Sequence, residues 1–356
     1  MNIKGRPWRC LLYFHYFINC IRHPNPLNKG QFNPSLIIQP KPVVLNSNRQ
    51  TRPSLNLDSV YFMHYLLLIF AVLFWSGNFI VGRGIHNDIP PITLAFWRWA
   101  VALLIILPFS LRQILHQRDL IRRNWKILTL LAILSVTNFS MFIYMALKSS
   151  TVTNTVLINS MIPIFIVLIS WMGFKERITL RQAIGIVISL TGLMFIIVHG
   201  NLSALISVRF GKGDMWTISA GLSWALYSVF LRKSPMELNP LSFLTTSIII
   251  GIFFIFPFYI WEISTGKTMN VTQASIGSIV YVALFSSILA YIFWNKAIQI
   301  IGANKTGIFI HLMPVFSIIL AIIFLNEELR EYHVKGTILI FTGIFLTTAG
   351  KIKSRR

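Results

Sequence analysis

The stretch HLMPVFSIILAIIFLNEEL, residues 311–329, has a proline inside a long apolar run and carboxylates near its far end. The stretch SMIPIFIVLISWMGFKER, residues 160–177, has the same pattern. In both stretches the proline precedes a glutamate by thirteen positions, Pro163 before Glu176 and Pro314 before Glu327. A pattern that occurs twice in one chain indicates a repeated structural unit.

The composition of the 356-residue chain is that of a membrane protein. Hydrophobic residues make up 55% of the chain and charged residues only 12%, and the mean hydropathy is +0.67. Soluble domains have roughly a quarter of charged residues. The few charges lie between apolar blocks of about 20 residues, which is the length that crosses a bilayer. Helices satisfy their own backbone hydrogen bonds in lipid, so we predict an all-α polytopic membrane protein.

Ten membrane spans can be marked from residue 64 onward, joined by short connections. They are 65–83, 92–111, 127–147, 151–173, 179–199, 214–232, 241–261, 275–295, 303–325 and 334–350. Residues 1–62 are basic and contain scattered prolines. We expect them to be a disordered cytoplasmic extension, or a translated segment upstream of a true start at Met63, and the sequence leaves both readings open.

The net charge of +22 is compatible with nucleic-acid binding. However, the Lys and Arg residues gather at the ends of the apolar runs, as membrane topology requires, so no nucleic-acid partner is expected. Most of these residues fall on the inner side if both termini are cytoplasmic. Cys10 and Cys20 have no ligand partners at metal-binding spacing, and we expect no metal and no cofactor.

The two halves of the chain, residues 64–200 and 213–351, align with each other. A shift of 149 positions matches Trp75, Arg83 and Pro91 with Trp224, Arg232 and Pro240. Further along the chain the shift is 151 positions, and it matches Ala146, Thr155, Pro163, Glu176, Gly185 and Gly192 with Ala297, Thr306, Pro314, Glu327, Gly336 and Gly343. Each half has five spans, an odd number, so the second half must lie upside down in the membrane relative to the first. Many secondary transporters build alternating access on such an inverted repeat.

At this point the residues resemble a known family. The runs ALKSSTVTNTVLINSMIPIFIVLISWMGFKERITLRQAIG and WNKAIQIIGANKTGIFIHLMPVFSIILAIIFLNEELREYHVKG are similar to the two copies of the EamA domain of the drug/metabolite transporter superfamily. The openings FWSGNFIVGR and LSWALYSVFLRK fit as well. The resemblance covers about residues 64–350. It implies a ten-helix carrier, usually a metabolite exporter, in a bacterial inner membrane or an organelle of similar origin, but it does not identify a substrate.

Aromatic and amide side chains predict a central binding pocket. Trp75 and Asn78 share one face of the first span, and their repeat mates Trp224 and Tyr227 share one face of the sixth. Trp and Tyr usually prefer the membrane interfaces, so aromatics near the centre are candidates for pocket walls, with helix packing as the alternative. Polar groups on the third and fourth spans could line the pocket or bridge helices: Asn138, Tyr144, Asn154 and Asn159.

Two ionisable residues inside spans are further candidates for substrate binding. Arg98, whose repeat mate is Ser247, could receive a substrate carboxylate or phosphate, or could extend to the outer surface. His311 is the best candidate for a titrating group inside the membrane, with a structural hydrogen-bonding role as the alternative. The carboxylates of Asp88, Asp214, Glu262 and Glu327 lie at span ends or in loops, so proton coupling is doubtful.

The repeated proline and glutamate have separate expected roles. Pro163 and Pro314 should bend the fourth and ninth spans, either as a fixed shape or as hinges for transport. Glu176 and Glu327 close the same spans and are expected to pair with a basic side chain or to cap a helix. The glycines Gly185, Gly192, Gly336 and Gly343 should allow two helices to approach closely.

We therefore expect a secondary transporter that exports a small metabolite, an amino acid or a related amphipathic compound, by alternating access. A carrier of organic anions or nucleotide sugars is the alternative within the superfamily. The chain is not expected to be an enzyme such as a lipid-linked transferase, because no motif of that chemistry is visible. The oligomeric state cannot be read from the sequence.

Overall fold

The computed structural model describes residues 57–198, 211–235, 237–325 and 328–348. The described part of the first half comprises α2 (Leu57–Gly84), α3 (Pro91–His116), α4 (Arg118–Arg123), α5 (Trp125–Ala132), η1 (Ile133–Asn138), α6 (Phe139–Ser149), α7 (Val152–Asn159), α8 (Ile162–Phe174) and α9 (Leu180–Ile197). That of the second half comprises α10 (Lys212–Phe230), η3 (Leu231–Lys233), α11 (Pro240–Ser264), α12 (Gln273–Tyr281), η4 (Val282–Leu289), α13 (Ala290–Ile301), α14 (Ala303–Gly307), η5 (Ile308–Leu312), α15 (Met313–Leu325) and α16 (Glu331–Thr348). None of these residues forms a strand, and the all-α prediction is confirmed.

Eight stretches of the described helices are long and apolar enough to cross a bilayer. The predicted spans at 214–232 and 334–350 correspond to α10 and α16, which are helical but do not reach that measure of length and hydropathy. The polytopic membrane fold is therefore confirmed, whereas the count of ten rests on the repeat. Helix α2 begins at Leu57, inside the segment predicted to be an extension, and residues 1–56 lie outside the described part.

Helices α3 and α11 hold equivalent places in the two halves and pack against each other in opposite directions. Both begin with a proline, which suits the first turn because the missing N–H has no helical partner there. Glu262, near the end of α11, accepts the backbone N–H of Thr93 at the start of α3 at 2.6 Å. Gln117, just after α3, accepts the backbone N–H of Asn239 at the start of α11 at 3.1 Å. A side chain near the end of each helix thus accepts a hydrogen bond from a backbone N–H at the start of the other helix, as expected for an antiparallel pair.

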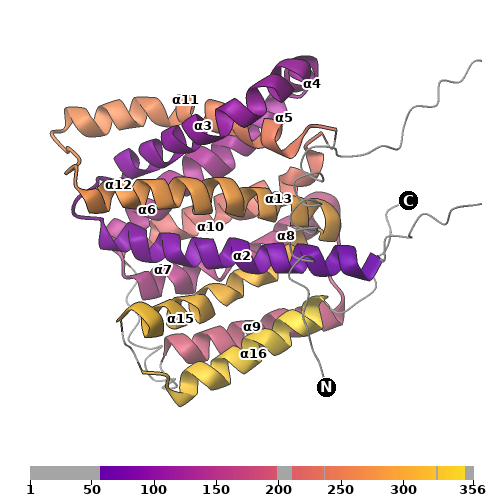
Figure 1. The fold of residues 1–356 in the computed structure, drawn as a ribbon. Helices are drawn as coiled ribbons and strands as arrows, with labels where there is room; N and C mark the ends of the chain where they lie inside the picture. Colours follow the sequence, from indigo (N-terminus) through magenta and orange to yellow (C-terminus); the bar gives the residue numbers. More distant parts are fainter. Residues whose placement is uncertain (1–56, 199–210, 236, 326–327, 349–356) are drawn as a thin grey trace, which may run out of the picture. The chain divides into compact units, whose positions relative to one another are not determined.

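Helices α9 and α16, the last of each half, lie side by side in Figure 1 and are also antiparallel. A Cβ atom on Gly192 would lie 2.6 Å from the carbonyl oxygen of Gly336, and one on Gly185 would lie 2.6 Å from that of Gly343. If the helices were parallel, each glycine would face its own repeat mate. Instead Gly185 faces Gly343 and Gly192 faces Gly336, which is the arrangement of an inverted repeat. The predicted close approach of these glycines is confirmed.

Two spans contain π-helical segments that the sequence did not reveal. The segment η1 follows α5 in the third span, and η4 follows α12 in the eighth. A shift of 151 places η1 at positions 284–289, inside η4, so the two segments are repeat mates. π-Helical turns occur frequently at functional sites, because they free backbone carbonyls and alter the helical phase.

The fourth and ninth spans are interrupted directly before their prolines. Helix α7 ends at Asn159, and α8 starts at Ile162 with Pro163 as its second residue. In the second half, the 3₁₀ segment η5 ends at Leu312, and Pro314 is the second residue of α15. The predicted discontinuity is therefore present, but each proline begins a new helix rather than interrupting an existing one.

Candidate functional site

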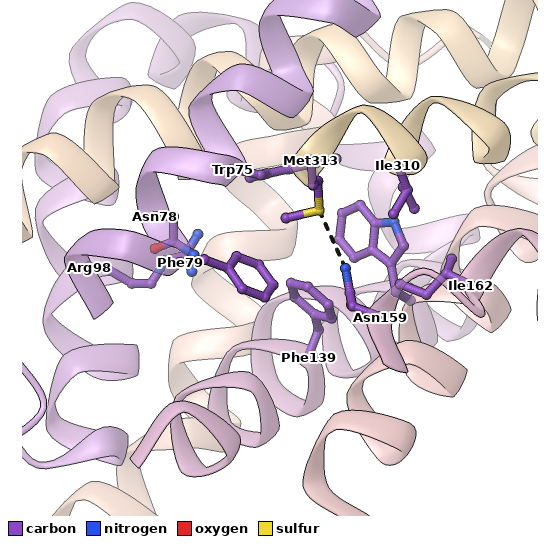
Figure 2. Close-up of a pocket in the computed structure, with 10 residues that line it drawn as sticks. Trp75, Asn78, Phe79, Arg98, Phe139, Asn159, Ile162, Ile310 and Met313 are labelled. Atoms are coloured by element: carbon purple, nitrogen blue, oxygen red, sulfur yellow. Dashed lines mark hydrogen bonds between the residues drawn. The ribbon is translucent and has the colours of Figure 1, made fainter. Parts of the chain in front are cut away.

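A pocket with an empty volume of about 350 Å³ lies between the two halves, beside the interrupted spans (Figure 2). It is lined by Trp75, Asn78, Phe79, Arg98, Phe139, Asn159, Ile162, Trp224, Ile310 and Met313. Three pairs of these residues are repeat mates: Trp75 with Trp224, Asn159 with Ile310, and Ile162 with Met313. Equivalent positions of the two halves therefore line the pocket together, as expected at a pseudo-two-fold axis. Its free space holds about one water molecule, so side chains must move to admit a larger ligand.

The indole rings of Trp75 and Trp224 meet in this pocket. Their centroids are 5.0 Å apart and their planes are nearly perpendicular, at 86°. Trp75 donates its indole N–H to the backbone carbonyl of Ser286 in η4 at 3.1 Å, so the ring is anchored to the second half. The ring of Trp294 lies 5.1 Å from Trp75, and that of Tyr291 lies 5.3 Å from Trp224. The contacts of Trp224 with Trp75 and Tyr291 are edge-to-face, and such contacts stabilise an aromatic cluster.

Each half holds one tyrosine–asparagine hydrogen bond, with the two residue types exchanged between the halves. In the first half, the Tyr144 hydroxyl donates to Asn78 Oδ1 at 2.7 Å. In the second, the Tyr227 hydroxyl donates to Asn295 Oδ1, also at 2.7 Å. Tyr227 is the repeat mate of Asn78, and Asn295 is the mate of Tyr144. The same cross-helix bond is thus kept in both halves by reciprocal substitution.

Arg98 is directed into the protein and lines the pocket, so it does not extend to the outer surface. It is 1% exposed. Its Nε donates to Ser287 Oγ at 2.8 Å and its Nη1 to the Tyr144 hydroxyl at 3.0 Å. The guanidinium also lies over the rings of Trp99, at 4.9 Å, and Tyr144, at 5.6 Å. No ion pair to Arg98 is present within the described residues, so its charge is moderated by hydroxyls and rings alone.

Asn159 contributes an unpaired acceptor to the same pocket. The residue is 3% exposed, and its Nδ2 donates to the sulfur of Met313 at 3.5 Å (Figure 2). Its Oδ1 is buried and has no hydrogen-bond partner. Buried amide oxygens are nearly always paired, so this atom is available for a ligand or a water molecule.

Five candidate residues do not line the pocket: Asn138, Tyr144, Asn154, Tyr227 and His311. Tyr144 bonds Arg98 and Asn78 beside the pocket, and Asn154 is half-buried in the first turn of α7. The ring of Tyr227 lies behind Trp224, at 5.1 Å. Asn138 is half-buried at the end of η1. A π-helical turn changes the direction in which side chains point relative to a regular α-helix. His311 is fully buried, with Nδ1 2.7 Å from Ser189 Oγ and Nε2 3.0 Å from the Ser160 carbonyl. Both its nitrogens are engaged between helices, which supports the structural alternative for this histidine.

Glu176 forms the ion pair expected of it. Both of its carboxylate oxygens accept hydrogen bonds from Arg232 at 2.6 Å, in a forked geometry. The Arg232 guanidinium also lies 4.4 Å from the ring of Phe174 at the end of α8. This ion pair joins the fourth span, which belongs to the first half, to the sixth span, which belongs to the second half. Its repeat counterpart, Glu327, lies outside the described residues.

The sequence did not single out several residues that complete the site. Ile162 and Met313 could have been found from the repeat, because they sit one position before the paired prolines. Phe79 and Phe139 have no such signal, since their repeat mates are Ser228 and Ala290. Ser287 reaches Arg98 from a π-helical segment, a feature that hydrophobic periodicity does not reveal.

Comparisons with known proteins agree with this architecture. The model of the EamA-like transporter family matches residues 62–198 and again residues 211–349. The uncharacterized transporter YyaM of Bacillus subtilis is 25% identical over 81% of this chain and 94% of its own length. An uncharacterized transporter of Archaeoglobus fulgidus is 26% identical over 80% of this chain and 97% of its own. A probable amino-acid metabolite efflux pump of Escherichia coli is 23% identical over 80% of this chain and 94% of its own.

A solved crystal structure has the same fold, with a TM-score of 0.65 at 16% identity, and the match covers 81% of this chain and 96% of that one. The two family matches coincide with the two antiparallel halves and with the paired residues of the pocket. The chain is an integral membrane protein and a transporter, and it belongs to the EamA-like transporter family.

Proposed function

We propose that the chain is a secondary carrier that exports a small amphipathic metabolite by alternating access. The observation that carries this proposal is the pocket on the pseudo-two-fold relation, walled by repeat mates from both halves. A ligand there would contact both halves at once, and rocking of one inverted repeat against the other would expose it to either side. The aromatic walls and Arg98 favour a molecule with an apolar body and an anionic group. Amino acids and organic acids both meet this description, and the printed name of the Escherichia coli relative supports metabolite export.

We further propose a bacterial inner membrane with both termini in the cytoplasm, as the distribution of Lys and Arg favours. Reconstitution of the full chain into proteoliposomes tests carrier function, and thiol labelling in intact cells tests orientation. In intact cells, a membrane-impermeant thiol reagent should label Lys267→Cys but not Arg118→Cys, in a background without Cys10 and Cys20. We expect saturable counterflow of labelled amino acids or hydroxy acids into preloaded vesicles. A flux that does not saturate would indicate a channel, and labelling of both cysteines from one side would contradict the topology.

The interruptions before Pro163 and Pro314 are proposed to be the bends at which each half opens and closes. Pro163→Ala and Pro314→Ala restore a backbone N–H donor, whose hydrogen bond favours a continuous helix by about 0.5–1.5 kcal/mol, so we expect counterflow to fall by up to roughly tenfold. The matched control is Pro257→Ala, which changes a proline inside α11 that does not line the pocket. Normal transport by both hinge variants, at normal levels of folded protein, would leave these prolines with a purely structural role.

A further inference from the structure

The charge balance of the pocket carries an inference about the substrate that rests on the proposed carrier function. Arg98 is the one lining residue with a formal charge, and the other nine are neutral. Outside the pocket, Glu176 forms an ion pair with Arg232 and Glu331 forms one with Lys335. Without ligand, the described pocket therefore holds one uncompensated positive charge in a low-dielectric site, which is unfavourable until an anion neutralises it.

Arg98 has the donors to bind such an anion. A guanidinium has five N–H groups, and two of them are used by Ser287 and Tyr144. These two bonds, together with the rings of Trp99 and Tyr144, hold the guanidinium in one orientation. The remaining N–H groups can form a forked pair of charge-assisted hydrogen bonds with a carboxylate.

The other polar group of the pocket requires a donor from the ligand. Asn159 Oδ1 is buried and unpaired, while its Nδ2 faces the sulfur of Met313. In the view of Figure 2 the rings of Phe79 and Phe139 lie between Arg98 and Asn159. A complementary ligand therefore has an anionic end, an apolar or aromatic body, and a hydroxyl or N–H group that donates to the amide oxygen.

We propose that the pocket selects a net anion, a small carboxylate with an aromatic or other apolar body and a neutral hydrogen-bond donor, over a zwitterion of the same shape. The carboxylate pairs with Arg98, the body lies between the aromatic rings, and the donor satisfies Asn159 Oδ1. A zwitterion brings an ammonium into a site whose lining offers it only a neutral amide oxygen, so its second charge is desolvated without a counter-charge. A cation is repelled by Arg98 as well.

Four compounds on one phenyl skeleton test this selection with purified full-length protein in proteoliposomes. They are 3-phenyllactate, with a carboxylate and a hydroxyl, 3-phenylpropionate, with a carboxylate alone, phenylalanine, with a carboxylate and an ammonium, and phenethylamine, with an ammonium alone. We expect counterflow of phenyllactate with a kcat/KM about tenfold above that of phenylalanine, phenylpropionate between them, and no counterflow of phenethylamine above that of protein-free vesicles.

Asn159→Leu separates the two ends of the ligand. Its repeat mate is the apolar Ile310, so the position tolerates an apolar side chain of similar size. In this variant we expect phenyllactate to lose its advantage over phenylpropionate, while both stay ahead of phenylalanine. If phenylalanine is carried as well as phenyllactate, with saturation, the carrier function stands and the selection for anions is overturned. If none of the four compounds exchanges, the aromatic carboxylate is overturned, and the wider amino-acid and hydroxy-acid counterflow then decides the carrier function separately.

Discussion

Arg98→Gln is expected to lower kcat/KM for a carboxylate substrate by about 30-fold or more without lowering the unfolding temperature. Loss of one partner of a buried, charge-assisted pair costs about 2–5 kcal/mol in binding, and each 1.4 kcal/mol is a factor of ten. The free protein, in contrast, is relieved of a buried guanidinium that has no ion pair among the described residues. Glutamine keeps an amide donor near the position of the Arg98 Nε, which bonds Ser287. Counterflow and thermal unfolding in detergent, measured on the same preparations, give both quantities.

The combination of the two readouts separates a binding role from a structural one. If Arg98 only fastens α3 to Tyr144 and Ser287, then Arg98→Gln should unfold at a lower temperature, and transport should fall only in proportion to the folded protein. Arg98→Lys is the companion variant, because it keeps the charge but loses the forked geometry. We expect its kcat/KM to lie between those of the wild type and Arg98→Gln. Full activity of Arg98→Gln would show that the substrate does not contact this residue.

Gly192→Ala is expected to destabilise the protein by about 1–3 kcal/mol, the usual cost of overpacking, and the double variant with Gly185→Ala by more. A Cβ at position 192 would lie 2.6 Å from the Gly336 carbonyl oxygen and 2.6 Å from the Leu339 Cβ. These atoms belong to the backbone and to the first atom of a side chain, so they can yield only if α9 and α16 separate. Thermal unfolding and the yield of folded protein after solubilisation measure the effect.

Gly277→Ala provides the matched control for this prediction. Gly277 is also inside a helix, α12, but a Cβ there would meet no atom within 4 Å. Alanine is the better helix former, so this variant should be neutral or stabilised by roughly 0.5–1 kcal/mol. Equal stability of Gly192→Ala and Gly277→Ala would mean that the close contact between α9 and α16 does not exist in the folded protein.

The sequence predicted the parts of the fold that depend on repetition and hydropathy. The shift of 149 positions matched Trp75 with Trp224, and these rings meet in the pocket. The shift of 151 positions identified the glycines of α9 and α16, because an odd number of spans forces the two copies to run in opposite directions. Such features need only the order of residues along the chain and the length of a membrane span.

The details that depend on helix rotation could not be predicted in this way. The π-helical segments η1 and η4 have no compositional signal, yet they decide which residues after them face the centre. Asn138, the last residue of η1, is half-buried and does not line the pocket, whereas Ser287, in η4, contacts Arg98. From its position alone, His311 was open to two roles, that of a titrating group and that of a structural hydrogen-bonding residue. Its contacts with Ser189 and with the Ser160 carbonyl, which define its role, come from helices far away in the chain.

The difference between Arg98 and its repeat mate Ser247 has a consequence for how such a protein can arise. A gene duplication yields two identical copies, and a dimer of one such copy would bury two guanidiniums at these positions instead of one. Fusion into a single chain allows one copy to keep the arginine while the other has a small neutral residue. From that point the halves are no longer interchangeable, and under the proposed carrier mechanism we expect the substrate to keep one orientation throughout its passage instead of two equivalent ones.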